Sequence, residues 1–244
     1  MENSMSWQDE YLALNYESPT GERLAYRLLS PKPFDPSKQY PVVLFFHGAG
    51  ERGNDNSSQL RHCLEQFAKP ANQEAFPCFV IAPQCPAEQQ WVNMQILAYE
   101  GVEQRPEQPT ANLRMAVEIL EQICNTRNID QNRVYVSGIS MGGYATWDCL
   151  TRWPEKFAAA VPICGGGEGN TITPEIVRIP VWTFHSVDDP IVPVFRTREM
   201  VAAMQRANGN IRYTEYQDYG HNSWTPAYAE PELFPWLFSQ QRRR

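Results

Sequence analysis

Short apolar runs recur along the chain between polar segments. Five nearly continuous runs lie at residues 42–46, 79–82, 134–137, 157–163 and 181–184. Runs of this length and composition are typical of strands buried on both faces of a parallel sheet. Three more strands are predicted at residues 11–16, 23–29 and 211–216. Ser18–Pro19–Thr20–Gly21 joins the first two as a turn.

Helical patterns lie between several of these strands. Residues 110–126 place Leu113, Val117, Leu120 and Cys124 at steps of three and four, and Thr110 can cap the start. Two further helices are predicted at 144–152 and 195–207, the second ended by Asn208–Gly209. Strands that alternate with helices imply right-handed crossovers. The pattern therefore predicts an α/β fold with a doubly wound, mostly parallel sheet, and we expect residues 1–244 to form one such domain.

Composition and charge narrow the function classes. The net charge is −7 and the pI about 5.2, so the surface should repel polyanions and nucleic-acid binding is not expected. The basic run 242–244 is interpreted as a solvated tail. No stretch approaches the roughly 18 apolar residues of a membrane span. No apolar signal segment is visible near Met1, which predicts a cytoplasmic protein, although a signal removed beforehand would leave the same sequence.

The six cysteines form no CxxC pair and no histidine lies at ligand spacing from them. Reduced thiols are therefore expected. Nothing in the sequence specifies an oligomeric state.

The segment Gly138–Ile139–Ser140–Met141–Gly142 matches the pattern G-x-S-x-G between a predicted strand and a predicted helix. A sharp strand-to-helix turn leaves no room for bulky neighbours, and it exposes the serine hydroxyl near a helix N-terminus that favours negative charge. The alternative is a glycine-rich turn without chemistry. The motif nevertheless makes Ser140 the candidate nucleophile.

A serine nucleophile needs a base, and the chain has four histidines. His62 is interpreted as a solvated residue in a helix. His47 and His185 each end an apolar strand and could sit near the site, but both precede the position expected for a base in chain order. His221 follows the last predicted strand, where a loop can fold over the carboxyl edge of the sheet. His221 is therefore the candidate base.

An acid is expected between the serine and the histidine. The loop after strand 181–184 carries two neighbouring candidates, Asp188 and Asp189. The alternative is that both are ordinary surface acids.

The segment 46–53, with the sequence FHGAGERG, follows the first buried strand. Its glycines let backbone amides turn toward an oxyanion, and the amide of Met141 is the expected second donor. A phosphate-binding loop is the alternative. It is disfavoured because no GK[ST] follows and the spacing G-x-G-x-x-G is absent.

With these segments in order, the chain resembles the α/β-hydrolase superfamily. More narrowly, it is similar to the small phospholipase/carboxylesterase group and to the "predicted peptidase" and feruloyl-esterase-like proteins. The segments that carry the resemblance are FHGAGERG (46–53), APQCP (82–86), GISMGG (138–143), DPIVP (189–193) and GHNSW (220–224).

The resemblance implies Asp189 as the catalytic acid and the amide of Ala49 as the first oxyanion donor. Glu51 and Arg52 are expected to brace this loop by an ion pair. The resemblance further implies ester hydrolysis through an acyl-enzyme, with no metal or organic cofactor, on a fold with a minimal cap.

Substrate preference is predicted from what the inserts contain. Residues 85–109 and 164–179 are polar or glycine-rich and offer no lipase-like lid, which favours short-chain or aryl esters. Trp91 and Trp224 either form an aromatic wall for the acyl group or pack in the interior. The alternatives are a peptidase of the prolyl-oligopeptidase type, which normally carries a large gating domain for which 244 residues leave no room, and an inactive binding module.

Overall fold

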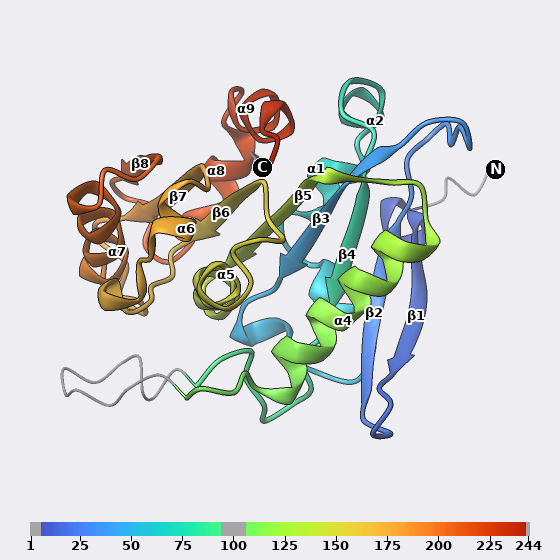
Figure 1. The fold of residues 1–244 in the computed structure, drawn as a ribbon, viewed down its shortest axis with the longest axis horizontal. Helices are drawn as coiled ribbons and strands as arrows, with labels where there is room; N and C mark the ends of the chain where they lie inside the picture. Colours follow the sequence, from blue (N-terminus) through green and yellow to red (C-terminus); the bar gives the residue numbers. More distant parts are fainter. Residues whose placement is uncertain (1–5, 94–105, 243–244) are drawn as a thin grey trace.

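The computed structural model describes residues 6–93 and 106–242, and its centre is an eight-stranded sheet (Figure 1). The strands are β1 (Tyr11–Glu17), β2 (Arg23–Leu29), β3 (Tyr40–Phe46), β4 (Phe79–Pro83), β5 (Ile129–Ile139), β6 (Ala159–Ile163), β7 (Val181–Ser186) and β8 (Ile211–Tyr216). Their order in the sheet is β1-β2-β4-β3-β5-β6-β7-β8. The chain thus builds outward in both directions from β3, as in other doubly wound folds.

The pairing confirms the predicted mostly parallel sheet. Strands β4, β3, β5, β6, β7 and β8 run parallel to one another. Strand β2 is antiparallel to both β1 and β4, and the turn at 18–21 joins it to β1 as expected. Because the six parallel strands all end at one edge, the loops that follow β3, β5, β7 and β8 meet there.

Helices cover both faces of the sheet (Figure 1). They are α1 (Leu64–Ala68), α2 (Pro70–Ala75), α4 (Ala111–Thr126), α5 (Met141–Arg152), α6 (Pro174–Val177), α7 (Phe195–Arg206), α8 (Trp224–Ala229) and α9 (Leu233–Ser239). Helices α4, α5 and α7 pack into one hydrophobic cluster, whereas α1, α8 and α9 pack into the other. In the described part of the chain, no helix is both long enough and apolar enough to cross a membrane.

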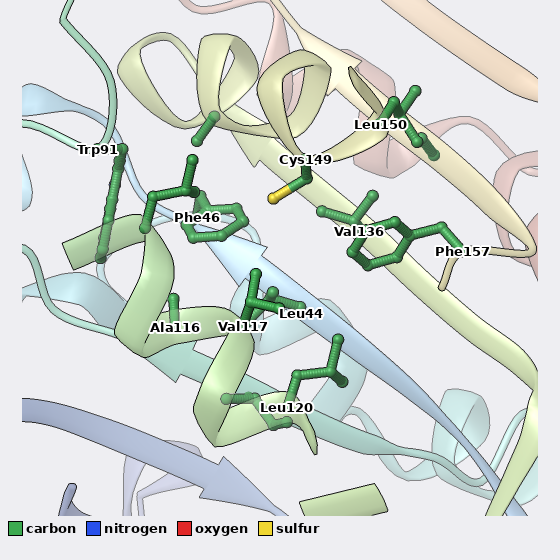
Figure 2. Close-up of a cluster of buried hydrophobic side chains, with 14 of the residues drawn as sticks. Leu44, Phe46, Trp91, Ala116, Val117, Leu120, Val136, Cys149, Leu150 and Phe157 are labelled. Atoms are coloured by element: carbon green, nitrogen blue, oxygen red, sulfur yellow. The ribbon is translucent and has the colours of Figure 1, made fainter. Parts of the chain in front are cut away.

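Alternate residues of β3 enter the two clusters. Leu44 and Phe46 point to the α4 and α5 side, and Val43 and Phe45 point to the α8 and α9 side. This period of two explains why β3 is apolar at every position. Figure 2 shows Leu44 and Phe46 between side chains of α4 and α5, with the ring of Trp91 beside Phe46.

The predicted long helices are confirmed with small shifts at their ends. Helix α4 begins at Ala111, and the Thr110 hydroxyl accepts a hydrogen bond from the Leu113 amide at 3.2 Å. Helix α5 begins at Met141, three residues before its predicted start, because the turn at the serine leads directly into the helix.

The short helices α1, α2, α8 and α9 were not predicted. Each has only five to seven residues, which is too short for a helical period to be recognised. His62 precedes α1 and does not lie in a helix, contrary to the prediction. Of the predicted polar insert at 85–109, residues 94–105 lie outside the described residues, as do Arg243 and Arg244.

The turn between β5 and α5 depends on a glycine. A Cβ atom on Gly142 would lie 2.0 Å from the Phe46 carbonyl oxygen of β3, which is backbone and cannot turn aside. Gly50 offers a matched control, because a Cβ there would meet nothing within 4 Å.

We therefore expect Gly142→Ala to lower the free energy of unfolding by at least about 3 kcal/mol or to prevent folding, since overpacking against backbone cannot relax. Gly50→Ala should change it by less than about 0.5 kcal/mol. Urea unfolding of the two variants measures the difference. Equal stability of both would mean that β3 and α5 are not in close contact.

Candidate active site

The turn at Ser140 has a strained backbone. Its φ is 53° and its ψ −118°, a conformation that a non-glycine residue rarely adopts. The Ser140 amide donates to the Ile163 carbonyl at 2.9 Å, and the Ser140 carbonyl accepts from the Gly143 amide at 2.8 Å. These bonds tie the serine to β6 and to the first turn of α5. The neighbouring structure thus holds the hydroxyl at the carboxyl end of β5.

The structure brings the predicted serine, histidine and acid together. His221 Nε2 lies 2.9 Å from Ser140 Oγ, and His221 Nδ1 lies 2.7 Å from Asp189 Oδ2. A carboxylate only accepts hydrogen bonds, so Nδ1 carries the proton and Nε2 is free to accept from the serine. The arrangement can transfer a proton from Ser140 to His221 when the hydroxyl attacks an electrophile.

The Asp189 carboxylate is buried, and both of its oxygens accept hydrogen bonds. Oδ1 accepts from the amides of Ile191 at 2.8 Å and Val192 at 2.9 Å. Oδ2 accepts from His221 and lies 3.1 Å from His185 Nε2. Burial raises the pKa of Asp189, but the hydrogen bonds from the two histidines and the two amides lower the pKa more, so it lies well below its usual value. Asp189 is therefore ionised at neutral pH.

Asp188 has a different environment. Its carboxylate is exposed, and it accepts from the Gly220 amide at 3.2 Å and from the Ser186 hydroxyl. It therefore supports the loop that carries His221, whereas Asp189 bonds the imidazole ring itself.

The two predicted oxyanion donors flank the serine. Met141 is the first residue of α5, so its amide has no acceptor within the helix. The loop after β3 approaches from the other side, since a Cβ on Gly48 would lie 3.6 Å from Ser140 Cβ. Ala49 follows in this loop, is exposed, and starts a 3-10 turn, Ala49–Glu51.

His47 fixes the orientation of the Gly48–Ala49 peptide. Its Nδ1 donates to the Gly48 carbonyl at 2.6 Å, while its Nε2 accepts from the Cys85 amide at 2.9 Å. In a trans peptide the carbonyl and the following N–H point in opposite directions, so this bond turns the Ala49 amide away from His47. Burial lowers the pKa of His47 to about 4, which keeps the ring neutral.

The predicted ion pair between Glu51 and Arg52 is not formed. The Arg52 guanidinium donates to the carbonyls of Ala49 at 2.9 Å and Gln89 at 3.2 Å. The buried Glu51 carboxylate faces His62 at 3.5 Å and Arg61 at 3.7 Å. Both residues brace the loop, but each uses partners from other segments, which adjacent positions in a sequence do not reveal.

His62 is not the solvated residue that the sequence predicted. Only 33% of its side chain is exposed, and its ring centroid lies 5.2 Å from that of Trp224. Burial raises the pKa of Glu51, but the hydrogen bond from His62 and the charge of Arg61 help to lower it more, so the pKa lies below its usual value.

The two candidate tryptophans have different places. Trp91 is fully buried, with its ring 5.0 Å from Phe46 and its Nε1 donating to the His47 carbonyl at 3.2 Å. It packs beneath the loop and offers no surface to a substrate, which corrects the aromatic-wall interpretation for this residue. Trp224 is partly exposed and stands edge-on to the His221 ring at 5.3 Å.

Cys164, Asp189 and His221 place possible metal ligands within 4.8 Å of one another. Metals bind the thiolate form of cysteine, but burial raises the pKa of the Cys164 thiol far above its ordinary value. The Asp189 oxygens and His221 Nδ1 are already hydrogen-bonded. The donor set therefore does not fit a metal.

Two further histidines support the site in roles that the sequence did not assign. His47 directly follows β3 and His185 lies near the end of β7, at the carboxyl edge where such folds place their sites, so the sequence could place them near the site. It could not show that His47 orients the Gly48–Ala49 peptide or that His185 contacts Asp189.

The sheet order, the turn at Ser140 and the loops that follow β3, β7 and β8 define an α/β-hydrolase. The model of the phospholipase/carboxylesterase family matches residues 34–229. The chain therefore belongs to the phospholipase/carboxylesterase family.

Comparisons with individual proteins agree with this family. A solved structure of a thermostable esterase is 41% identical, with a TM-score of 0.88 over 96% of this chain. A bifunctional acetylxylan esterase/xylanase of Neocallimastix patriciarum is 31% identical over 85 residues, 35% of this chain. The chain spans 64% of the thermostable esterase and 12% of the esterase/xylanase.

A more distant structure shares the fold. The feruloyl esterase module of Clostridium thermocellum, solved with sinapinate, is 16% identical, with a TM-score of 0.66 over 96% of this chain and 89% of its own.

The depressed pKa of His47 predicts a pH-dependent stability. In the unfolded chain His47 takes up a proton below its ordinary pKa of 6.5, whereas in the fold it does so only near pH 4. Stability is therefore lost as the pH falls from 6.5 toward 4. Between pH 8 and pH 5 the wild type should lose about 2 kcal/mol more unfolding free energy than His47→Gln. Urea unfolding at both pH values measures this, and parallel losses would exclude a buried neutral His47.

Proposed function

We propose that this chain hydrolyses carboxylic esters by way of an acyl-enzyme on Ser140. The observation that carries the proposal is the continuous hydrogen-bonded path from Ser140 Oγ through His221 to the buried Asp189, with distances of 2.9 Å and 2.7 Å. Membership of the phospholipase/carboxylesterase family supports the same chemistry. The proposal places the whole reaction in one domain, residues 1–244, without a cofactor.

In the proposed mechanism Ser140 Oγ attacks the ester carbonyl carbon while His221 Nε2 takes its proton. The amides of Met141 and Ala49 stabilise the resulting oxyanion. Collapse of the tetrahedral intermediate expels the alcohol, which receives the proton from His221, and leaves an ester on Ser140. Water then attacks this ester with His221 again as base, and the carboxylic acid leaves. Asp189 keeps the histidine in the required tautomer and stabilises the imidazolium.

The proposed substrates are esters of short-chain or aromatic acids. Three apolar side chains, Val187, Ile191 and Tyr219, are exposed on the loops that carry Asp189 and His221. The proposal assigns them, together with Trp224, whose ring stands 5.3 Å from that of His221, to an open apolar surface for the acyl group. The similar proteins include an acetylxylan esterase and a feruloyl esterase, whose names point to acyl groups of this size.

The proposed triad predicts losses of kcat of different size for three variants. Ser140→Ala should lower kcat for p-nitrophenyl acetate by at least about 100-fold, since removal of a triad serine usually costs far more. Asp189→Asn should lower it by up to about 10⁴-fold, because the amide favours the wrong histidine tautomer. Asp188→Asn is the matched control, and its loss should be much smaller because that carboxylate bonds the Ser186 hydroxyl and the Gly220 amide, not the His221 ring.

Circular dichroism and urea unfolding are the controls that test whether the three variants are folded. A larger loss in Asp188→Asn than in Asp189→Asn would overturn the choice of acid. A fluorophosphonate probe tests the nucleophile directly, since labelling should require Ser140. A folded protein without labelling or ester turnover would be an inactive binding module, and cleavage of a peptide amide in preference to esters would make it a peptidase.

An open site also predicts how the rate depends on acyl chain length. Each buried methylene is worth about 0.8 kcal/mol, so a deep tunnel would raise kcat/KM steadily with length. A shallow apolar surface should instead raise it over the first few carbons and then level off. We expect a preference for acetyl to hexanoyl or aryl esters, without activation by emulsified substrate. The measurement is kcat/KM for p-nitrophenyl acetate through palmitate, beside methyl ferulate.

A continued rise to the C16 ester, or a jump in rate above the solubility limit of the substrate, would contradict this prediction. Either result would identify a lipase.

A further inference from the structure

A second histidine contacts the acid of the proposed triad. His185 lies near the end of β7, is fully buried, and takes no part in the proton path described above. Its Nε2 lies 3.1 Å from Asp189 Oδ2 and 2.9 Å from the Val192 carbonyl, and its Nδ1 lies 2.7 Å from Thr197 Oγ1. Both ring nitrogens therefore have partners within the fold.

The partners of Nε2 fix where its proton is. An ionised carboxylate and a backbone carbonyl can only accept hydrogen bonds. Nε2 therefore carries a proton and donates it to Asp189 and Val192. On the other side of the ring, Thr197 lies at the start of α7 and its hydroxyl reaches the Gly165 carbonyl at 2.8 Å. The ring is thus held between β7, the loop of the acid and α7.

Asp189 Oδ2 therefore receives two imidazole N–H groups, from His221 and His185. The Asp189 side chain is fully buried, so solvent cannot replace a lost donor. His185 and Asp189 also hold Val192 together, since the histidine binds its carbonyl and the carboxylate binds its amide. Removing His185 would leave His221 as the one remaining imidazole donor to Oδ2 of the carboxylate that aligns it.

We propose that His185 is a positioning residue that donates a hydrogen bond to Asp189 Oδ2 and so keeps the carboxylate aligned with His221. This inference rests on the proposed triad. His185 acts on the reaction only through Asp189 and does not touch the substrate. A buried histidine that merely fills the core would stabilise the fold but would show no dependence on Asp189.

The test compares His185→Leu with His185→Gln in p-nitrophenyl acetate hydrolysis. Leucine removes the donor, whereas glutamine keeps a side-chain N–H near the position of Nε2. We expect His185→Leu to lower kcat about 10- to 100-fold, as for residues that orient active-site ligands, with KM changed less than about twofold. His185→Gln should recover most of the loss. His185→Met, a flexible apolar replacement, takes the place of the leucine variant if that variant does not fold.

Thr183→Val is the matched control. Thr183 lies two residues earlier on β7, is equally buried, and gives its hydroxyl to the Pro162 carbonyl at 2.8 Å. The Thr183→Val variant should lose stability but keep kcat within about twofold, because the neutral buried hydrogen bond that it removes involves neither His185 nor Asp189.

A double-mutant cycle identifies the route of the effect. In the Asp189→Asn background, His185→Leu should cause little further loss of kcat. An equal loss in both backgrounds, an unchanged kcat in His185→Leu, or an equal loss in His185→Gln would overturn the inference. These outcomes differ from a failure of the proposed function, in which the wild type itself would lack Ser140-dependent ester turnover.

Discussion

The first turn of α5 lies directly against the end of β3, with no space for a side chain between them. Gly142 faces the Phe46 carbonyl and Gly138 faces the Gly142 carbonyl, so backbone meets backbone on both sides of Ser140. This close packing makes the positive φ of Ser140 sustainable, because the segments on either side cannot relax. It also brings the loop after β3 beside the serine, so that the position of the proposed nucleophile and that of the proposed oxyanion donors have one common origin.

The site also depends on one buried charge, the carboxylate of Asp189. A buried carboxylate is stable only when hydrogen bonds replace its hydration. Asp189 obtains four, two from the backbone of its own loop and two from histidines on β7 and after β8. The loop supplies the two backbone hydrogen bonds because residues 189–192 turn back on the carboxylate. The fold therefore ties the ends of β7 and β8 together through one side chain.

Most strands of the sheet and the loops that carry the candidate site could be predicted from the sequence. Continuous apolar runs identify buried strands, and the order of serine, acid and histidine identifies the loops, because both signals are local. The predictions for His62 and for the Glu51–Arg52 pair were wrong, and the two interpretations of Trp91 stayed open, because these environments depend on contacts between distant segments. His62, for example, meets Trp224 and Glu51 only after the chain has folded. The role of His185 could not be predicted either, since nothing near it in the sequence shows that its two nitrogens face a carboxylate and a hydroxyl.

Under the proposed mechanism, the hydrogen bond from His47 to the Gly48 carbonyl has a consequence for the height of the reaction barrier. A donor that had to rotate toward the oxyanion would add a reorganisation energy to every turnover. Here the peptide dipole is set once, during folding, by a neutral imidazole whose other nitrogen is occupied by the Cys85 amide. A preorganised dipole of this kind stabilises developing charge without moving. The barrier then depends on how rigidly β3 and the segment around Cys85 hold one peptide plane.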